Sequence, residues 1–251
     1  MDQPISNPLF VIVIIALLGV MIGLAKGGLQ GLGALLTPLL SLVLPPALAV
    51  GVILPMLMVG DAFAVYLYRG EWDTALVRRL LPGAVVGALV GTFLLTRLPG
   101  NAMRVGLALF TLLAVGYKLV SSAIHRWRYQ PRPWHAPTAG LVTGVASALF
   151  NLGGPPFNAY LLLQNTSPRT FVATTAIFFA LLNLIKVPGF LWARVIDLPL
   201  LASVWWVFLF IPVGILLGRE LIKRLNQPVF EWLVMGLLVA TSLLLLWQGL
   251  G

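Results

Sequence analysis

The chain of 251 residues is 60% hydrophobic and only 9% charged, with a formal net charge of +9 and no cysteine. About a quarter of the residues in a soluble domain are charged, so this composition excludes a water-soluble fold and predicts an integral membrane protein. The lack of cysteine excludes disulfides, thiolate metal sites and cysteine nucleophiles. Because Lys and Arg mark the cytoplasmic loops of membrane proteins, the positive charge does not indicate a nucleic-acid partner.

Long apolar runs follow one another along the chain. Most of them approach the ~20 residues that an α-helix needs to cross ~30 Å of hydrocarbon. Short strands of alternating polarity are absent from the sequence, which favours helices over a barrel. We therefore expect an all-α polytopic protein in a lipid bilayer. The runs are Pro8 to Ala25, Pro46 to Leu67, Leu80 to Leu95, Met103 to Val120, Phe171 to Phe190, Leu198 to Leu217 and Phe230 to Trp247.

A hydrophilic stretch at 125–137, HRWRYQPRPWHAP, divides the chain almost in half, and the order of features repeats on either side of it. Repeated halves are a recurrent plan among secondary transporters. The sequence predicts a first transmembrane repeat at 1–121, a linker at 122–136 and a second repeat at 137–251, with about five helical segments in each repeat. The matching pairs are GLAKGGLQGLGALL (23–36) with GVASALFNLGGPPF (144–157), LPPALAV (44–50) with TSPRTFV (166–172), and PGAVVGALVG (82–91) with IPVGILLG (211–218).

The basic residues predict how the two repeats are oriented. The linker holds three arginines and is expected to be cytoplasmic. Counting crossings outward from the linker then places the basic residues at 69–79 and those at 219–224 on the same side of the membrane as the linker. This arrangement requires an odd number of crossings in each repeat, so we expect inverted halves with both termini outside. The inner basic residues are Arg126, Arg128, Arg132, Arg69, Arg78, Arg79, Arg219, Lys223 and Arg224.

The stretch SALFNLGGPPFNAY at 147–160 interrupts apolar sequence with paired asparagines, glycines and prolines. In lipid, each backbone group that such residues release costs several kcal/mol unless protein or a water-filled cavity satisfies it. The pattern predicts a loop inside the bundle and a short helix from near Gly154, with Pro155 and Pro156 in its first turn. The equivalent break at 26–33, KGGLQGLG, predicts a second helix start from the opposite side. We expect these half helices to meet near the membrane midplane.

Two converging helix N-termini can hold an anion, because each presents free N–H groups and a positive dipole end. The amides and glycines of the two breaks are the candidate ligands. The alternative is that the glycines only allow helices to pack closely. We assign that packing role to the pairs Gly87/Gly91 and Gly214/Gly218. The candidate anion ligands are Gln30, Gly31, Gly33, Asn151, Gly153, Gly154 and Asn158.

Three ionisable residues within apolar sequence are further candidates, since such residues are functional by default. Lys26 lies at the first break and Lys186 lies one turn after Asn183. Each lysine either binds the anion or extends to the membrane interface. Asp61 lies inside the run 46–67, at the position that corresponds to Asn183. We expect Asp61 to carry a coupling proton or to pair with a lysine.

Catalytic motifs are missing from the sequence. Both histidines lie in the linker, and H-E-x-x-H, G-x-S-x-G and the nucleotide-binding glycine loop are absent. We therefore expect no enzyme activity, no metal site, no bound cofactor and no primary pumping by this chain alone.

The two glycine-rich breaks resemble those of the sulfite exporter TauE/SafE family. Each break is followed by a short apolar helix, a proline near the next helix start, and later a proline with glycines four residues apart. The resemblance runs from about residue 15 to 250. The family's glycine signatures fall on Gly27, Gly28, Gly31, Gly33, Gly153 and Gly154.

This resemblance implies a multi-pass carrier of the bacterial inner membrane for sulfur-containing anions such as sulfite, sulfoacetate or thiosulfate, without a cofactor. The chain has GGPP where the family more often has a longer glycine run. We expect a secondary transporter that works by alternating access, with protons as the candidate coupling ion. The alternatives are an anion channel that uses the same breaks as its filter, and a membrane scaffold without a substrate.

Overall fold

The computed structural model describes residues 8–27, 29–124, 132–164, 166–203 and 205–251, and the regular structure in these ranges is helical. This confirms the all-α prediction for the described residues. The elements of the first half are α1 (Pro8–Lys26), the 3-10 helix η1 (Gln30–Leu35), α2 (Leu36–Ser41), α3 (Pro46–Leu67), α4 (Thr74–Arg97) and α5 (Gly100–Ile124). The later elements are α6 (His135–Phe150), α7 (Gly154–Leu162), α8 (Pro168–Trp192), α9 (Leu198–Ser203), the 3-10 helix η2 (Trp205–Leu209), α10 (Phe210–Arg224) and α11 (Gln227–Leu250).

Five of the described helices are long and apolar enough to cross a membrane, at 21 to 25 residues each. With a rise of 1.5 Å per residue, such helices reach ~30 Å, the thickness of the hydrocarbon core. The chain is therefore a multi-pass membrane protein. The five segments are Pro46–Leu67, Thr74–Arg97, Gly100–Val120, Pro168–Trp192 and Pro228–Leu250.

Helical structure enters both ends of the predicted linker. α5 continues to Ile124 because residues 121–124 contain no glycine or proline to end it, and α6 already begins at His135. Residues 125–131, the centre of the linker, lie outside the described part of the chain. We call the face of the molecule where α5 ends and α6 begins the linker side.

Polar residues cap three of the long helices. Asp73, Ser167 and Asn226 precede α4, α8 and α11, and the side chain of each accepts a hydrogen bond from the backbone N–H three residues later, at 3.0, 3.2 and 3.4 Å. Such caps satisfy backbone donors that a helix leaves unpaired in its first turn. The starts of these helices are thus determined by local sequence.

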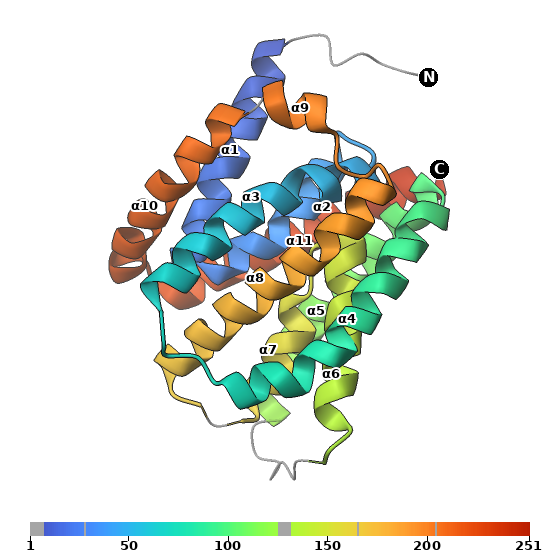
Figure 1. The fold of residues 1–251 in the computed structure, drawn as a ribbon. Helices are drawn as coiled ribbons and strands as arrows, with labels where there is room; N and C mark the ends of the chain where they lie inside the picture. The colour runs from blue at the N-terminus through green and yellow to red at the C-terminus, as the bar shows by residue number, and fades with distance from the viewer. Residues whose placement is uncertain (1–7, 28, 125–131, 165, 204) are drawn as a thin grey trace.

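The helices pack in pairs that join the two halves of the chain. α1 lies along α10, α4 along α6, α5 along α11, and α3 contacts α8. In Figure 1, α1 begins at the top of the view and α6 begins at the bottom, so the first helices of the two halves run in opposite directions. Every one of these four pairs takes one helix from each half.

Glycines bring two of these pairs into close backbone contact. A Cβ atom on Gly214 would lie 2.5 Å from the carbonyl oxygen of Val20, and one on Gly87 would lie 2.1 Å from that of Leu141. The second glycine of each pair would make contacts at 2.8 Å. Any larger residue would push the helices apart, which confirms the packing role predicted for these glycines.

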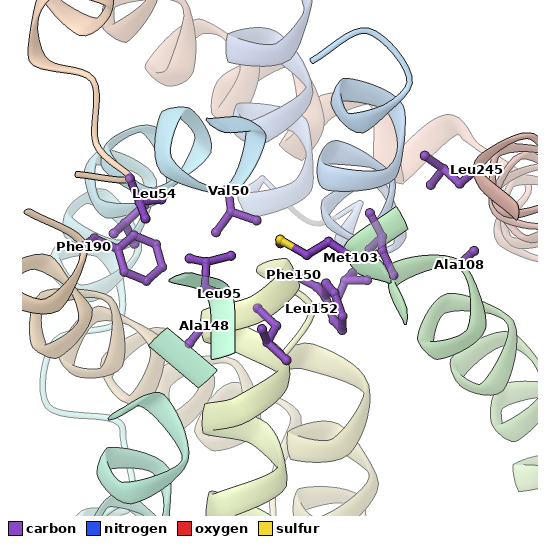
Figure 2. Close-up of a cluster of buried hydrophobic side chains, with 13 residues drawn as sticks. Val50, Leu54, Leu95, Met103, Ala108, Ala148, Phe150, Leu152, Phe190 and Leu245 are labelled. Atoms are coloured by element: carbon purple, nitrogen blue, oxygen red, sulfur yellow. The ribbon is translucent and has the colours of Figure 1, made fainter. Parts of the chain in front are cut away.

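A cluster of buried apolar side chains fills the interior away from the linker side (Figure 2). It contains side chains from the start of α3, the end of α4, the start of α5 and the ends of α6, α8 and α11. We call it the central apolar cluster. Because it includes Phe150 and Leu152, it also fixes the second break in place. Its members are Val50, Leu54, Leu95, Met103, Leu107, Ala108, Ala148, Leu149, Phe150, Leu152, Phe190, Val195 and Leu245.

Candidate functional site

The second break forms as the sequence predicts. Asn151 ends α6 in the left-handed conformation, with φ 53°, which asparagine tolerates better than most residues. α7 begins at Gly154 with prolines in its first turn and has only 9 residues, too few to span a bilayer. The break therefore leaves a helix N-terminus inside the bundle.

The first break differs from the prediction of a second α-helix start. A 3-10 helix begins at Gln30 and passes into α2, which has only 6 residues. Gly31 and Gly33 are poor α-helix formers, and short 3-10 turns are common where an α-helix cannot yet form. Gly28 and the side chain of Gln30 lie outside the described part of the structure. The role of the Gln30 amide as an anion ligand stays a prediction.

Asp61 lies at the centre of the site, with 1% of its side chain exposed. One carboxylate oxygen forms an ion pair with Lys26, the last residue of α1. The other oxygen accepts a hydrogen bond of 2.7 Å from the side-chain amide of Asn183 on α8. Both oxygens of the buried carboxylate are thus satisfied, and the contacts join α1, α3 and α8.

Lys186 is buried, with 2% exposure, and therefore does not extend to the membrane interface. Its ammonium group donates to the carbonyl and hydroxyl oxygens of Ser147, at 3.1 and 3.0 Å, and to the amide oxygen of Asn151 at 3.0 Å. An ammonium group has three N–H donors and no acceptor, so these three oxygens match its full capacity. Lys186 holds α8 against the end of α6.

Asn151 uses both ends of its side-chain amide within the protein. Its oxygen accepts from Lys186, and its nitrogen donates to the carbonyl oxygen of Val50 at 3.0 Å. The expected free N–H donor for an anion is therefore engaged with α3 in this conformation. Asn151 is partly buried, and the neighbouring lysine and carbonyl supply a partner for each polar end of its amide.

A cavity of about 660 Å³ reaches the two breaks from the linker side. Its wall includes Lys118 and Glu231, whose side chains are 48% and 51% exposed, close to the end of α5 and the start of α11. Tyr68, at the end of α3, also belongs to the wall. The cavity thus opens where α5 ends. The predicted site residues on its wall are Lys26, Gly31, Gly33, Asn151, Gly154 and Asn158.

Asn158 has unused hydrogen-bonding capacity at this cavity. Its amide oxygen is buried and has no hydrogen-bond partner among the described residues. The side chain also lines the cavity, and its amide nitrogen carries two N–H donors for an anion. It lies in the first turns of α7, whose N-terminus adds a positive partial charge.

The sulfite exporter TauE/SafE family model matches residues 14–245. The chain belongs to this family. The probable membrane transporter protein YtnM of Bacillus subtilis (strain 168) is 28% identical over 197 residues, which cover 70% of this chain and 60% of that protein. The chain thus spans about 60% of the length of this relative. No solved structure matches the chain.

Not every residue predicted for this TauE/SafE protein lies on the cavity wall. Asp61 and Lys186 lie behind the wall. Asp61 contacts Lys26 and Asn183, and Lys186 contacts Ser147, and these three partners line the cavity. A Cβ on Gly153 would lie 3.0 Å from the carbonyl oxygen of Thr143, so this glycine packs against α6.

Ser147 is the site residue that sequence reasoning missed. It lines the cavity and binds Lys186 through two of its oxygens. A signal for it was available: in the alignment that pairs Gly23 with Gly144, Ser147 stands opposite Lys26.

Proposed function

We propose that this TauE/SafE family member is a secondary transporter of small sulfur-containing anions, such as sulfite, sulfoacetate or thiosulfate, across the bacterial inner membrane. The observation that carries the proposal is the cavity that is lined by Lys26, by the Asn158 amide and by the start of α7. A lysine ammonium, a neutral donor and a helix N-terminus together attract an oxyanion. The family name supports sulfur chemistry for the substrate.

The positions of the cavity and of the central apolar cluster fit a mechanism of alternating access. The cavity opens on the linker side, whereas the central apolar cluster fills the opposite side of the breaks. A site that is open to one side and closed to the other is expected of a carrier in one of its two states, rather than of an open channel. In this proposal the linker side is cytoplasmic, and the structure corresponds to the inward-open state.

Matching contacts support the proposal of two inverted repeats. A Cβ on Gly23 would lie 2.3 Å from the carbonyl oxygen of Ile211, and one on Gly144 would lie 2.2 Å from that of Ala84. The sequence comparison pairs Gly23 with Gly144, and it pairs Ile211 with Ala84 when the glycines of 82–91 and 211–218 are aligned. Equivalent residues therefore make the same contact in both of these helix pairs.

The ion pair between Lys26 and Asp61 provides a route for proton coupling. An anion that enters the cavity competes with the Asp61 carboxylate for the Lys26 ammonium group. A buried carboxylate that loses its cation is stabilised by taking up a proton. We propose that Asp61 carries the coupling proton in this way.

Calorimetric titration of the purified protein with sulfite, sulfoacetate and thiosulfate tests the proposal, together with counterflow in proteoliposomes. We expect saturable binding and counterflow of at least one anion. Lys26→Gln should weaken binding by about tenfold or more, since a hydrogen bond to a charged group contributes about 1.5–3 kcal/mol. Lys223→Gln, which changes an exposed lysine paired with Glu220, is the matched control and should bind normally. Absence of binding by all three anions contradicts the proposal.

A further inference from the structure

Asn183 connects the buried carboxylate of Asp61 to the cavity. It is only 3% exposed, yet it belongs to the cavity wall, whereas Asp61 does not. α3 and α8 lie side by side (Figure 1), and the amide nitrogen of Asn183 donates to Oδ2 of Asp61 over 2.7 Å. A change of charge at Oδ2 therefore reaches the cavity wall through a single amide group.

The ion pair with Lys26 determines which end of this amide faces Asp61. A carboxylate beside an ammonium group is ionised, and an ionised carboxylate only accepts hydrogen bonds. The nitrogen of the Asn183 amide must therefore face Oδ2, as the structure has it. The end of the amide that remains for the cavity is its oxygen, which repels an anion.

We propose that Asn183 is an anion ligand whose orientation depends on the protonation of Asp61. The inference rests on the transport function and the proton coupling proposed above. Oδ1 faces the ammonium group of Lys26, which has donors only, so a proton taken up from solution binds to Oδ2. The new O–H group is a donor, and the Asn183 amide turns its oxygen toward it. The same turn directs the two N–H donors of the amide into the cavity.

This turn makes the binding of the proton and the binding of the anion favour each other. With Asp61 ionised, the Asn183 amide presents an oxygen to the cavity. With Asp61 protonated, it presents N–H donors, and hydrogen bonds to a charged ligand are among the strong ones. Because the coupling is reciprocal, a bound anion stabilises the protonated acid by the same factor. Asn183 is thus a second link between proton and anion, beside the competition for Lys26.

Other charged groups around Asp61 do not hold the Asn183 amide in place. Lys186 lies one turn beyond Asn183, and its three donors are used in bonds to the end of α6 and the second break. η1 and α2 contain no titratable residue, and that of α6 lies at its start on the linker side. The charged residues of α10 lie on its exposed last turns. Lys118 of α5 pairs with Glu231 of α11 at the mouth of the cavity.

Titration calorimetry at pH 5.5 and pH 8 with thiosulfate, sulfoacetate and sulfite tests the inference. Asn183→Leu keeps the approximate size of the side chain and removes the amide. Relative to the wild type at the same pH, this variant should bind the anion about tenfold or more weaker at pH 5.5 and with little change at pH 8. Comparison at one pH cancels any titration of the anion itself.

Asn158→Leu is the matched control, because Asn158 also lines the cavity and the described contacts of Asp61 are to Lys26 and Asn183. It should weaken binding by the same factor at both pH values. An equal loss of affinity at both pH values in Asn183→Leu, or no loss at either, overturns the inference.

These outcomes separate the inference from the proposals on which it rests. If the wild type binds no anion, the transport proposal is wrong. If it binds thiosulfate, whose charge is constant over this range, equally at both pH values, the proton coupling is wrong and the inference falls with it. If Asn183→Leu keeps the pH dependence of the wild type, the coupling stands and the inference alone is wrong. Should Asn183→Leu fail to fold, Asn183→Ser, which keeps a small donor beside Oδ2, should show the same loss at pH 5.5 alone.

Discussion

The side-chain amide of Asn183 donates to the carboxylate of Asp61 over 2.7 Å and joins α8 to α3. The sequence comparison assigns these two residues to corresponding positions in the two halves. When two halves are related by a two-fold axis, a residue that touches its own counterpart lies on that axis. In the proposed arrangement, the Asp61–Asn183 contact therefore marks the centre of the transporter.

Asp61→Asn should leave sulfite binding in place and flatten the pH dependence of uptake. The amide keeps the size and a hydrogen-bonding oxygen of the carboxylate but cannot carry a proton. Uptake into proteoliposomes, measured from pH 5.5 to 8 for the wild type and the variant, provides the measurement. A variant with the wild-type pH profile would show that Asp61 is structural.

Asn158→Ala should mainly weaken anion binding, whereas Asn151→Ala should mainly lower stability. The Asn158 side chain lines the cavity and carries amide N–H donors, and no described residue bonds to its oxygen, so its loss should weaken anion binding by about ten- to a hundredfold with little change in stability. The Asn151 amide bonds to Lys186 and Val50, so its loss should lower the melting temperature. Calorimetry and melting curves of both variants separate these effects. A lower melting temperature with normal binding in Asn158→Ala would contradict the assignment of Asn158.

Gly153→Val should abolish transport by displacing α7. A Cβ at this position already lies 3.0 Å from the Phe179 ring, the Ser147 Cβ and the Thr143 carbonyl oxygen, and a branched side chain adds two further carbons. Gly116→Ala in α5 is the control, since its Cβ has no atom within 4 Å. Counterflow and size-exclusion profiles of both variants provide the measurement. Normal counterflow by Gly153→Val would show that the position of α7 does not matter.

Thr138→Cys should react with membrane-impermeant thiol reagents only from the cytoplasmic side. Thr138 is exposed at the start of α6 on the linker side, and the chain has no cysteine of its own. Gly100→Cys, at the other end of α5, should react only from the outside. Labelling of intact cells and of inside-out vesicles tests both. The reverse pattern would invert the predicted topology.

Features encoded by local sequence were predictable in this chain. Five of the seven long apolar runs became membrane-length helices, whereas the run 198–217 is divided among α9, η2 and α10. The glycines and prolines at 147–160 produced the break and the start of α7. Asp61 was recognisable because a charge inside an apolar run requires a partner. Each of these signals is contained within about twenty residues.

Contacts between distant segments were not predictable from the same patterns. Asn151 bonds to Val50, which lies 101 positions away, and Lys186 bonds to Ser147, which lies 39 positions away. Only the packing of α3, α6 and α8 brings these groups together. The amide of Asn151 is for this reason engaged within the protein, although its sequence context equally suits a ligand.

The glycine contacts between α1 and α10 and between α4 and α6 also bear on how the chain assembles during synthesis. Both pairs take one helix from each half, and their backbones approach too closely for a side chain to fit between them. During synthesis, α1 and α4 therefore enter the membrane before the helices that pack on their glycine faces. The partner of α1 is complete only when residues 210–224 have been synthesised. A ribosome that stops at the linker leaves a fragment without these two interfaces, so quality-control proteases should remove truncated chains efficiently.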